Sequence, residues 1–203
     1  MKKYFLILAL FLVASGCEKV NLEGPDTLPA PGLGRQKAEI PEVSTPFTAS
    51  FRTSGEPTFI AEGLALVLGG SISGQATHVG LLQEGSTWDY YFPVESGGYV
   101  KLSDLLTTLD YEEIPALLSV LEQETIQLPL GGTIHSANGD YYTYFGFVEV
   151  VRDTGLLTGI MNFTGGTGRF EGVTGAITLN GWADIALGEA AFRGVGTIIF
   201  PKR

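Results

Sequence analysis

The chain of 203 residues contains one cysteine and two histidines, and each scarcity excludes a class of site. With Cys17 alone, no disulfide can form within the chain, so the fold must be stabilised by packing. His78 and His135 lie in predicted strands, and nothing in their spacing joins them to acidic residues as a set of metal ligands. We therefore expect no metal site and no cofactor.

Basic residues are also few. The 12 Lys and Arg are outnumbered by 22 Asp and Glu, which gives a formal net charge of −10 at pH 7. Such a chain is not expected to bind nucleic acid or to be attracted to anionic lipid, because both need clustered basic residues. The serine-hydrolase motif Gly-x-Ser-x-Gly is absent as well, because "GGSISG" has a different spacing around Ser71.

The N-terminus has the pattern of a signal peptide. Lys2 and Lys3 precede an unbroken apolar run from Tyr4 to Ala14, and small residues follow up to Cys17. The pattern predicts a signal peptide over residues 1–16, which is too short for a permanent transmembrane helix. "VASGC" resembles a bacterial lipobox, with Ala14 where leucine is more usual. The resemblance implies cleavage before Cys17 and acyl chains on that residue, which would anchor the protein in a membrane. The alternative is an ordinary secreted protein with a stray cysteine.

Residues 17–46 are predicted to be a lipidated tether, because prolines occur there among glycines and charged residues and no apolar period is sustained. Glu18 follows the cysteine in place of aspartate, so the best-known signal for retention in the inner membrane is absent. We expect a location in the cell envelope, at the outer membrane or on the surface of a Gram-negative bacterium. Loss of Lys2 and Lys3 with the signal peptide would change the net charge from −10 to −12. The prolines of the tether are Pro25, Pro29, Pro31, Pro41 and Pro46.

Residues 47–203 are expected to form one all-β domain. "FTASFRT" (47–53) alternates between apolar and polar residues, which is typical of a half-buried strand, and similar short runs follow with glycine turns between them. "SISGQATHVGLLQ" (71–83) is expected to form a hairpin with the run before it. Short strands with such turns favour a sandwich or a barrel. Glycines inside the strands favour the barrel, where strands coil sharply and backbones approach closely: Gly63, Gly74, Gly80, Gly146, Gly159, Gly194 and Gly196.

One segment, residues 102–123, has a helical period. Its apolar residues recur three and four positions apart, Ser103 can cap the first turn, and Pro115 suits the start of a second helix. The pattern predicts a small helical insertion between strands. It would either plug one end of the barrel or cover a sheet edge, or else form a lid over a ligand cavity.

"FTGGTGRFEG" (163–172) raises the question whether its glycines hold a ligand or shape the backbone. A nucleotide-binding loop is disfavoured, because the run has no lysine and another β-like run follows it. We expect the glycines to adopt positive φ in a tight turn, with a phenylalanine on each side anchored in the barrel. Arg169 is predicted to pair with Asp140 and so to tie two turns together. The structural residues of this motif are Asn138, Gly139, Asp140, Gly165, Gly166, Gly168, Arg169 and Phe170.

Three motifs taken together resemble a known group. "SANGDYYTYFGFVEV" (136–150), followed by "FTGGTGRFEGVTGAITLNG" (163–181), resembles a group of bacterial secreted β-barrel proteins that are similar to the plant dirigent and allene oxide cyclase barrels. "GQATHVGLL" (74–82) resembles the early glycine-histidine-glycine strand of the group. The resemblance covers residues 47–200 apart from the helical insertion. It implies a single antiparallel barrel of about eight strands. In the plant barrels, an apolar cavity guides cyclisation or coupling of reactive substrates without a bound cofactor.

No catalytic residue of those enzymes can be matched to this chain, so none is assigned. The ligand-binding candidates are His78 and His135, together with Trp88 and Tyr90 of an aromatic strand. For each of them, packing in a strand is the alternative role. The sequence favours a lipid-anchored, non-enzymatic barrel that binds a small apolar ligand or a partner. A cofactor-free isomerase or cyclase and a structural accessory of a surface complex are the alternatives, and the oligomeric state stays open.

Overall fold

The computed structural model describes residues 42–61, 64–94, 98–106, 119 and 123–202. They belong to one compact unit, Glu39–Arg203, whereas Met1–Ala38 forms a second unit that lies outside the described residues. The predicted signal peptide, Cys17 and most of the predicted tether therefore lie outside the described part. The strands of the compact unit are β1 (Val43–Ser54), β2 (Pro57–Ala61), β3 (Leu64–Val67), β4 (Gly69–Ala76), β5 (Gly80–Leu81), β6 (Thr87–Pro93), β7 (Tyr99–Lys101), β8 (Thr125–His135), β9 (Tyr141–Val151), β10 (Leu156–Gly166), β11 (Thr174–Asp184) and β12 (Glu189–Phe200).

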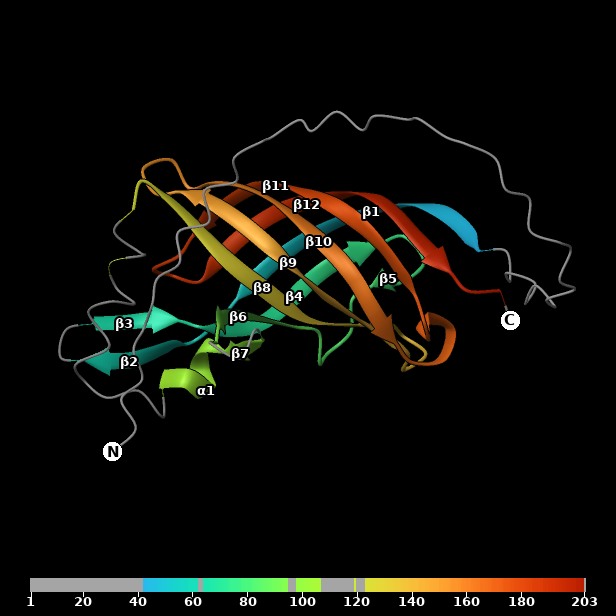
Figure 1. Ribbon diagram of the computed structural model, residues 1–203, viewed down its shortest axis with the longest axis horizontal. Coiled ribbons are helices and arrows are strands. Elements are labelled where there is room, and N and C mark those ends of the chain that lie inside the picture. Colours follow the sequence, from blue (N-terminus) through green and yellow to red (C-terminus); the bar gives the residue numbers. More distant parts are fainter. Residues whose placement is uncertain (1–41, 62–63, 95–97, 107–118, 120–122, 203) are drawn as a thin grey trace, which may run out of the picture. The chain divides into compact units, whose positions relative to one another are not determined.

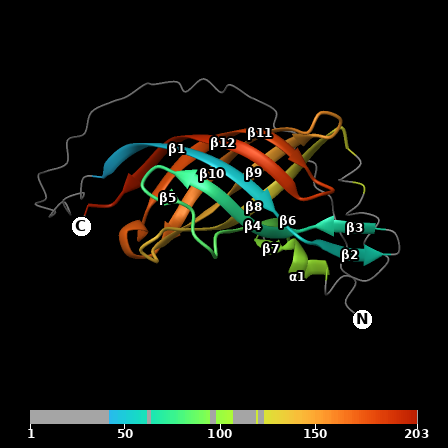
Figure 2. The same ribbon diagram turned by 180° about the vertical axis from the view of Figure 1, so that it is seen from behind.

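The main sheet closes on itself. Its antiparallel order is β5-β4-β1-β12-β11-β10-β9-β8-β6-β7, and β4 also pairs with β6. The strands β4, β1, β12, β11, β10, β9, β8 and β6 thus form a ring of eight, while β5 and β7 each extend one member of it. Figure 1 shows the long strands β8–β12 side by side, and Figure 2 shows β1 and β4 on the opposite side. The predicted antiparallel barrel of about eight strands is confirmed.

The number of residue pairs between neighbouring strands differs around the ring. β1 and β12 pair from Val43–Phe200 to Thr53–Ala190, a register of eleven residue pairs. The β4–β6 seam has three pairs, Gly69–Asp89, Gly70–Trp88 and Ser71–Thr87, and β6 pairs with β8 over four. Strand β6 is therefore the ring member with the shortest ladders on both sides.

One strand boundary and one strand pairing differ from the sequence-based expectation. β1 begins at Val43, so residues 43–46 of the predicted tether belong to the strand. Pro46 is tolerated there because β4 joins β1 only from Ala49 onward, which leaves β12 as the one neighbour at the proline. The hairpin predicted between residues 71–83 and the run before them is wrong: β4 pairs with β1, and β2 pairs with β3 in a separate two-stranded sheet.

The first turn of the predicted helical insertion is present as α1 (Leu102–Leu106), whose Leu102 is buried. Lys101, at the end of β7, donates a hydrogen bond of 2.8 Å to Asp89 of β6 and so fixes the start of α1 against the barrel. Residues 107–118 and 120–122 of the insertion lie outside the described residues.

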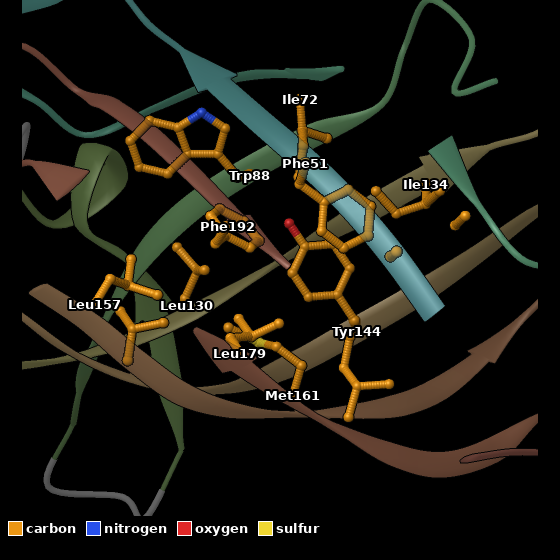
Figure 3. Packing of buried hydrophobic residues seen from close by; sticks show 14 of the residues in the cluster. Phe51, Ile72, Trp88, Leu130, Ile134, Tyr144, Leu157, Met161, Leu179 and Phe192 are labelled. Atoms are coloured by element: carbon orange, nitrogen blue, oxygen red, sulfur yellow. The ribbon is translucent and has the colours of Figure 1, made fainter. Parts of the chain in front are cut away.

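The core is the inside of the barrel. Alternate residues of each ring strand are buried, as in β9, whose burial alternates from Tyr142 to Val150. Figure 3 shows side chains from all eight ring strands pointing toward one another. Those labelled are Phe51, Ile72, Trp88, Leu130, Ile134, Tyr144, Leu157, Met161, Leu179 and Phe192. This apolar interior stabilises the fold through burial of apolar surface, which contributes roughly 25 cal/mol per Å².

Candidate functional site

The lumen is filled by its own side chains. Two cavities of about 20 Å³ each lie inside the barrel, and Leu130 and Phe192 line both. A volume of that size holds roughly one water molecule. Inward-facing glycines make the tight packing possible, because a Cβ at Gly146 or Gly196 would overlap the backbone of the adjacent strand. The predicted close approach of backbones at these glycines is confirmed.

Trp88 and Tyr90, two of the ligand-binding candidates, lie on β6 and face the lumen, where both line one cavity. Trp88 donates from Nε1 to the carbonyl oxygen of Ser54 at 3.3 Å, and its ring meets that of Tyr90 edge to face at 5.0 Å between centroids. Both side chains thus act as core residues of the barrel and already occupy the space that a ligand would need.

Three tyrosines contribute hydroxyl groups to this apolar interior. Burial raises the pKa values of Tyr90, Tyr142 and Tyr144 well above the usual value for a phenol, because the charged phenolate would lose its hydration. Tyr144 donates a hydrogen bond of 3.1 Å to the carbonyl oxygen of Thr87 and thereby links β9 to β6. All three are held neutral at physiological pH, so none can act there as a phenolate base.

The two histidines lie apart from these cavities. His78 occupies the turn between β4 and β5 with φ of +67°, not the predicted strand. Its ring meets Phe200 edge to face at 5.4 Å, and its Nε2 is buried without a hydrogen-bond partner among the described residues. His135 ends β8, as predicted, and stacks on Tyr141 at 5.0 Å. Neither lines either of these two cavities, and the described residues contain no group of three potential metal ligands.

The Asn-Gly-Asp turn and the glycine-rich run are in contact, as the sequence predicted, but through different atoms. Asp140 Oδ2 accepts hydrogen bonds from the backbone N–H of Arg169 at 3.2 Å and from Asn138 Nδ2 at 2.8 Å. The predicted ion pair with the Arg169 side chain is wrong, because the guanidinium lies over the Phe170 ring, 4.7 Å from its centroid. Asp140 therefore holds the backbone of the short 3₁₀ helix η1 (Gly168–Phe170).

The glycines of this motif shape the backbone in two ways. Gly165 and Gly168 have positive φ, at +124° and +53°, as predicted, whereas Gly166 is required by close packing against the backbone of Tyr141. A Cβ at Gly168 would overlap the Asp140 carboxylate. The two predicted anchors, Phe163 and Phe170, are buried and both meet the ring of Tyr142, at 5.1 and 5.5 Å.

The outside of the barrel has features that the sequence analysis did not single out. Tyr91, Tyr99, Phe145 and Phe147 form an outer aromatic cluster, with neighbouring centroids 4.9–6.1 Å apart. The rings of Tyr91 and Phe145 cover Gly131 of β8. Outward positions on β9–β12 add further exposed apolar side chains: Phe147, Leu156, Ile160, Trp182 and Val195. Alternation in these strands predicts outward positions, but the sequence gives no sign of which ones become neighbours.

Comparisons with known proteins do not assign the chain to a family. No family model matches the chain, and no curated protein matches it. Chains of solved structures do match, and two of them follow. Both are dirigent proteins. The pterocarpan synthase dirigent protein GePTS1 is 14% identical with a TM-score of 0.41, over 80% of this chain and 87% of that one. The pterocarpan synthase dirigent protein PsPTS1 is 16% identical with a TM-score of 0.40, over 79% of this chain and 97% of that one.

No helix among the described residues is long and apolar enough to cross a membrane.

Proposed function

We propose that the protein is a lipid-anchored component of the cell envelope that binds a partner through the outer surface of its barrel. The observation that supports this role is the filled lumen, in which two cavities of about 20 Å³ lie among mainly apolar side chains, with Thr53, Asp184 and Glu189 at the second. The barrel then acts as a rigid scaffold, and its recognition surface is the exposed face of the sheet.

The size of the cavities counts against the two roles that need an internal ligand. Pockets for small molecules have volumes of roughly 300–1,000 Å³, and even benzene needs a cavity of about 150 Å³. A carrier or a cyclase would have to displace several core side chains, such as Phe192 and Leu130, before a substrate could enter. The packing therefore favours the partner-binding role over both.

Native mass spectrometry tests this part of the proposal. The chain with Cys17→Ala, which cannot be lipidated at that position, is purified gently and its mass is measured before and after denaturation. We expect the same mass in both states. A small apolar molecule released on denaturation would overturn the filled-barrel role and would favour a carrier or an enzyme.

The anchor rests on the signal-peptide and lipobox pattern of the sequence and has its own test. Several acyl chains on Cys17, each burying methylenes at about 0.8 kcal/mol per CH₂, would hold the protein at a membrane. Cys17→Ala is expected to move the protein from the membrane fraction to the soluble fraction. Cys17→Ser serves as a second variant that keeps a polar side chain. Unchanged fractionation of both would refute the anchor.

A further inference from the structure

The outer face of β9–β12 carries apolar and polar residues in rows that run across the strands. Of the nine large hydrophobic residues exposed in the described part of the chain, five lie on this face. The registers place Trp182 beside Leu156 in one apolar row, and Ile160 between Thr178 and Phe147 in another. Val195 extends the second row because it pairs with Thr178. Large apolar side chains gathered on one exposed face are a common mark of a protein–protein interface.

A polar row lies between the two apolar rows, and its ends carry opposite charges. It runs from Arg193 on β12 through Asn180 and Thr158 to Glu149 on β9. Both charged side chains are exposed. Glu149 accepts a hydrogen bond of 3.2 Å from Gln127, which leaves its other carboxylate oxygen available, and no ion pair involves Arg193 within the described residues.

We propose that this face binds a second copy of the same chain, about a two-fold axis that runs parallel to the strands between β10 and β11. Such an axis brings each row opposite itself in reversed order. Trp182 then faces Leu156 of the copy, Val195 faces Phe147, and Arg193 faces Glu149. An interface of this type is isologous, so every contact occurs twice and the assembly closes as a dimer.

The charges favour this axis over an axis in the same plane that runs perpendicular to the strands along the polar row. A two-fold axis perpendicular to the strands would bring each strand opposite itself, so Arg193 would face Arg193 and Glu149 would face Glu149. Like charges brought together in this way oppose association, whereas opposite charges steer it and fix its register. The barrel is convex, so β10 and β11 form the centre of the interface, and the long Arg193 and Glu149 side chains reach across its rim.

The direction in which the two tethers leave the dimer favours the same axis, provided that the protein carries the proposed lipid anchor. An axis parallel to the strands leaves the strand direction of both copies the same. The two β1 strands therefore begin, at Val43, on the same end of the dimer. Both tethers can then reach one membrane, where confinement raises the effective concentration of each copy for the other.

The test uses the Cys17→Ala chain, so that it does not depend on lipidation, and measures mass by sedimentation equilibrium up to about 100 μM. We expect a dimer that weakens at high salt, because the rim charges are screened. Arg193→Glu and Glu149→Arg, each alone, should weaken association at least tenfold, since both copies of the pair become repulsive. The control Glu171→Arg changes the net charge by the same amount as Glu149→Arg, at an exposed site outside the face, and should leave the dimer intact.

Rescue makes the test specific to the proposed pairing. The double variant R193E/E149R should dimerise like the parent chain, and the two single variants should associate with each other when mixed. A monomer at all concentrations, a trimer or larger ring, or charge variants that dimerise as well as the parent would each overturn the proposal. Circular dichroism of the variants shows whether the barrel is folded. Because the anchor is tested by fractionation and the dimer by mass, either can fail without the other.

Discussion

Gly168→Ala is expected to destabilise the barrel through two separable costs. Gly168 has φ of +53°, and the left-handed conformation costs an alanine about 1–2 kcal/mol. The new Cβ would also overlap the Asp140 carboxylate, which must move and give up its hydrogen bonds to the Arg169 N–H and to Asn138. Bonds to a charged group contribute about 1.5–3 kcal/mol, and exposure at this turn reduces that to about 1 kcal/mol. The total is about 2–3 kcal/mol.

A double-mutant cycle separates the two costs. Asp140→Ala alone should cost about 1 kcal/mol, because it removes the same hydrogen bonds. In the Asp140→Ala background, Gly168→Ala no longer displaces anything and should cost only its backbone strain. The double variant is therefore expected to fall short of additivity by about 1 kcal/mol, the cost of the lost hydrogen bonds, which lies in the range found for residues in contact.

Urea denaturation, analysed with a common m-value, measures each corner of the cycle. Gly80→Ala is the matched control, because Gly80 also has positive φ, +78°, but would place its Cβ in open space. Its cost should equal the backbone strain alone. If Gly168→Ala costs no more than Gly80→Ala, or if the costs in the double variant are additive, then a Cβ at position 168 does not displace the Asp140 carboxylate.

Three further outcomes follow from the burial of particular side chains. The pKa values of Tyr90, Tyr142 and Tyr144 are raised in the folded state, so above pH 10 the unfolded chain loses protons that the folded chain keeps. The free energy of unfolding should therefore fall as pH rises from about 10, by roughly 4 kcal/mol per pH unit for the three tyrosines together. Phenolate absorbance measures the titration and should rise together with unfolding. A gradual rise in absorbance without cooperative unfolding would contradict the prediction. Trp182 is 48% exposed and Trp88 2%, so Trp182→Phe should remove most of the fluorescence that acrylamide quenches; unchanged quenching would refute that placement. Phe192→Ala should cost about 3–5 kcal/mol and join the two cavities, so that benzene raises Tm for the variant but not for the parent; a benzene effect on the parent would mean that the lumen is not filled.

The strand pattern could be predicted from the sequence because it is local. The alternation around Phe47, Ala49 and Phe51 is the alternation of burial seen in β1, and the helical period at Leu102 is present in α1. Both depend on the geometry of a few consecutive residues, since side chains alternate across a strand and recur every 3.6 residues in a helix.

The pairing of distant segments and the direction of single side chains could not be predicted in the same way. β4 pairs with β1 and closes on β6, although the chain offers β3 as a nearer neighbour. Arg169 was expected to reach Asp140, but stacking on Phe170 is available to it locally, and the backbone N–H satisfies the carboxylate instead. Side-chain choices of this kind are decided by small energy differences in three dimensions, which spacing does not encode.

The short ladders on both sides of β6 give the barrel a preferred place to open. Three residue pairs on one side and four on the other hold this strand, whereas β1 and β12 share eleven. Since local opening starts where the fewest backbone hydrogen bonds must break, amide protons of β6 should exchange with solvent sooner than those of β11 or β12. Trp88 and Tyr90 would swing outward with the strand. The barrel is closed in its average structure, but β6 is the strand at which it would open first. The fraction of time that β6 is detached would then determine how much of the time solvent can reach the lumen.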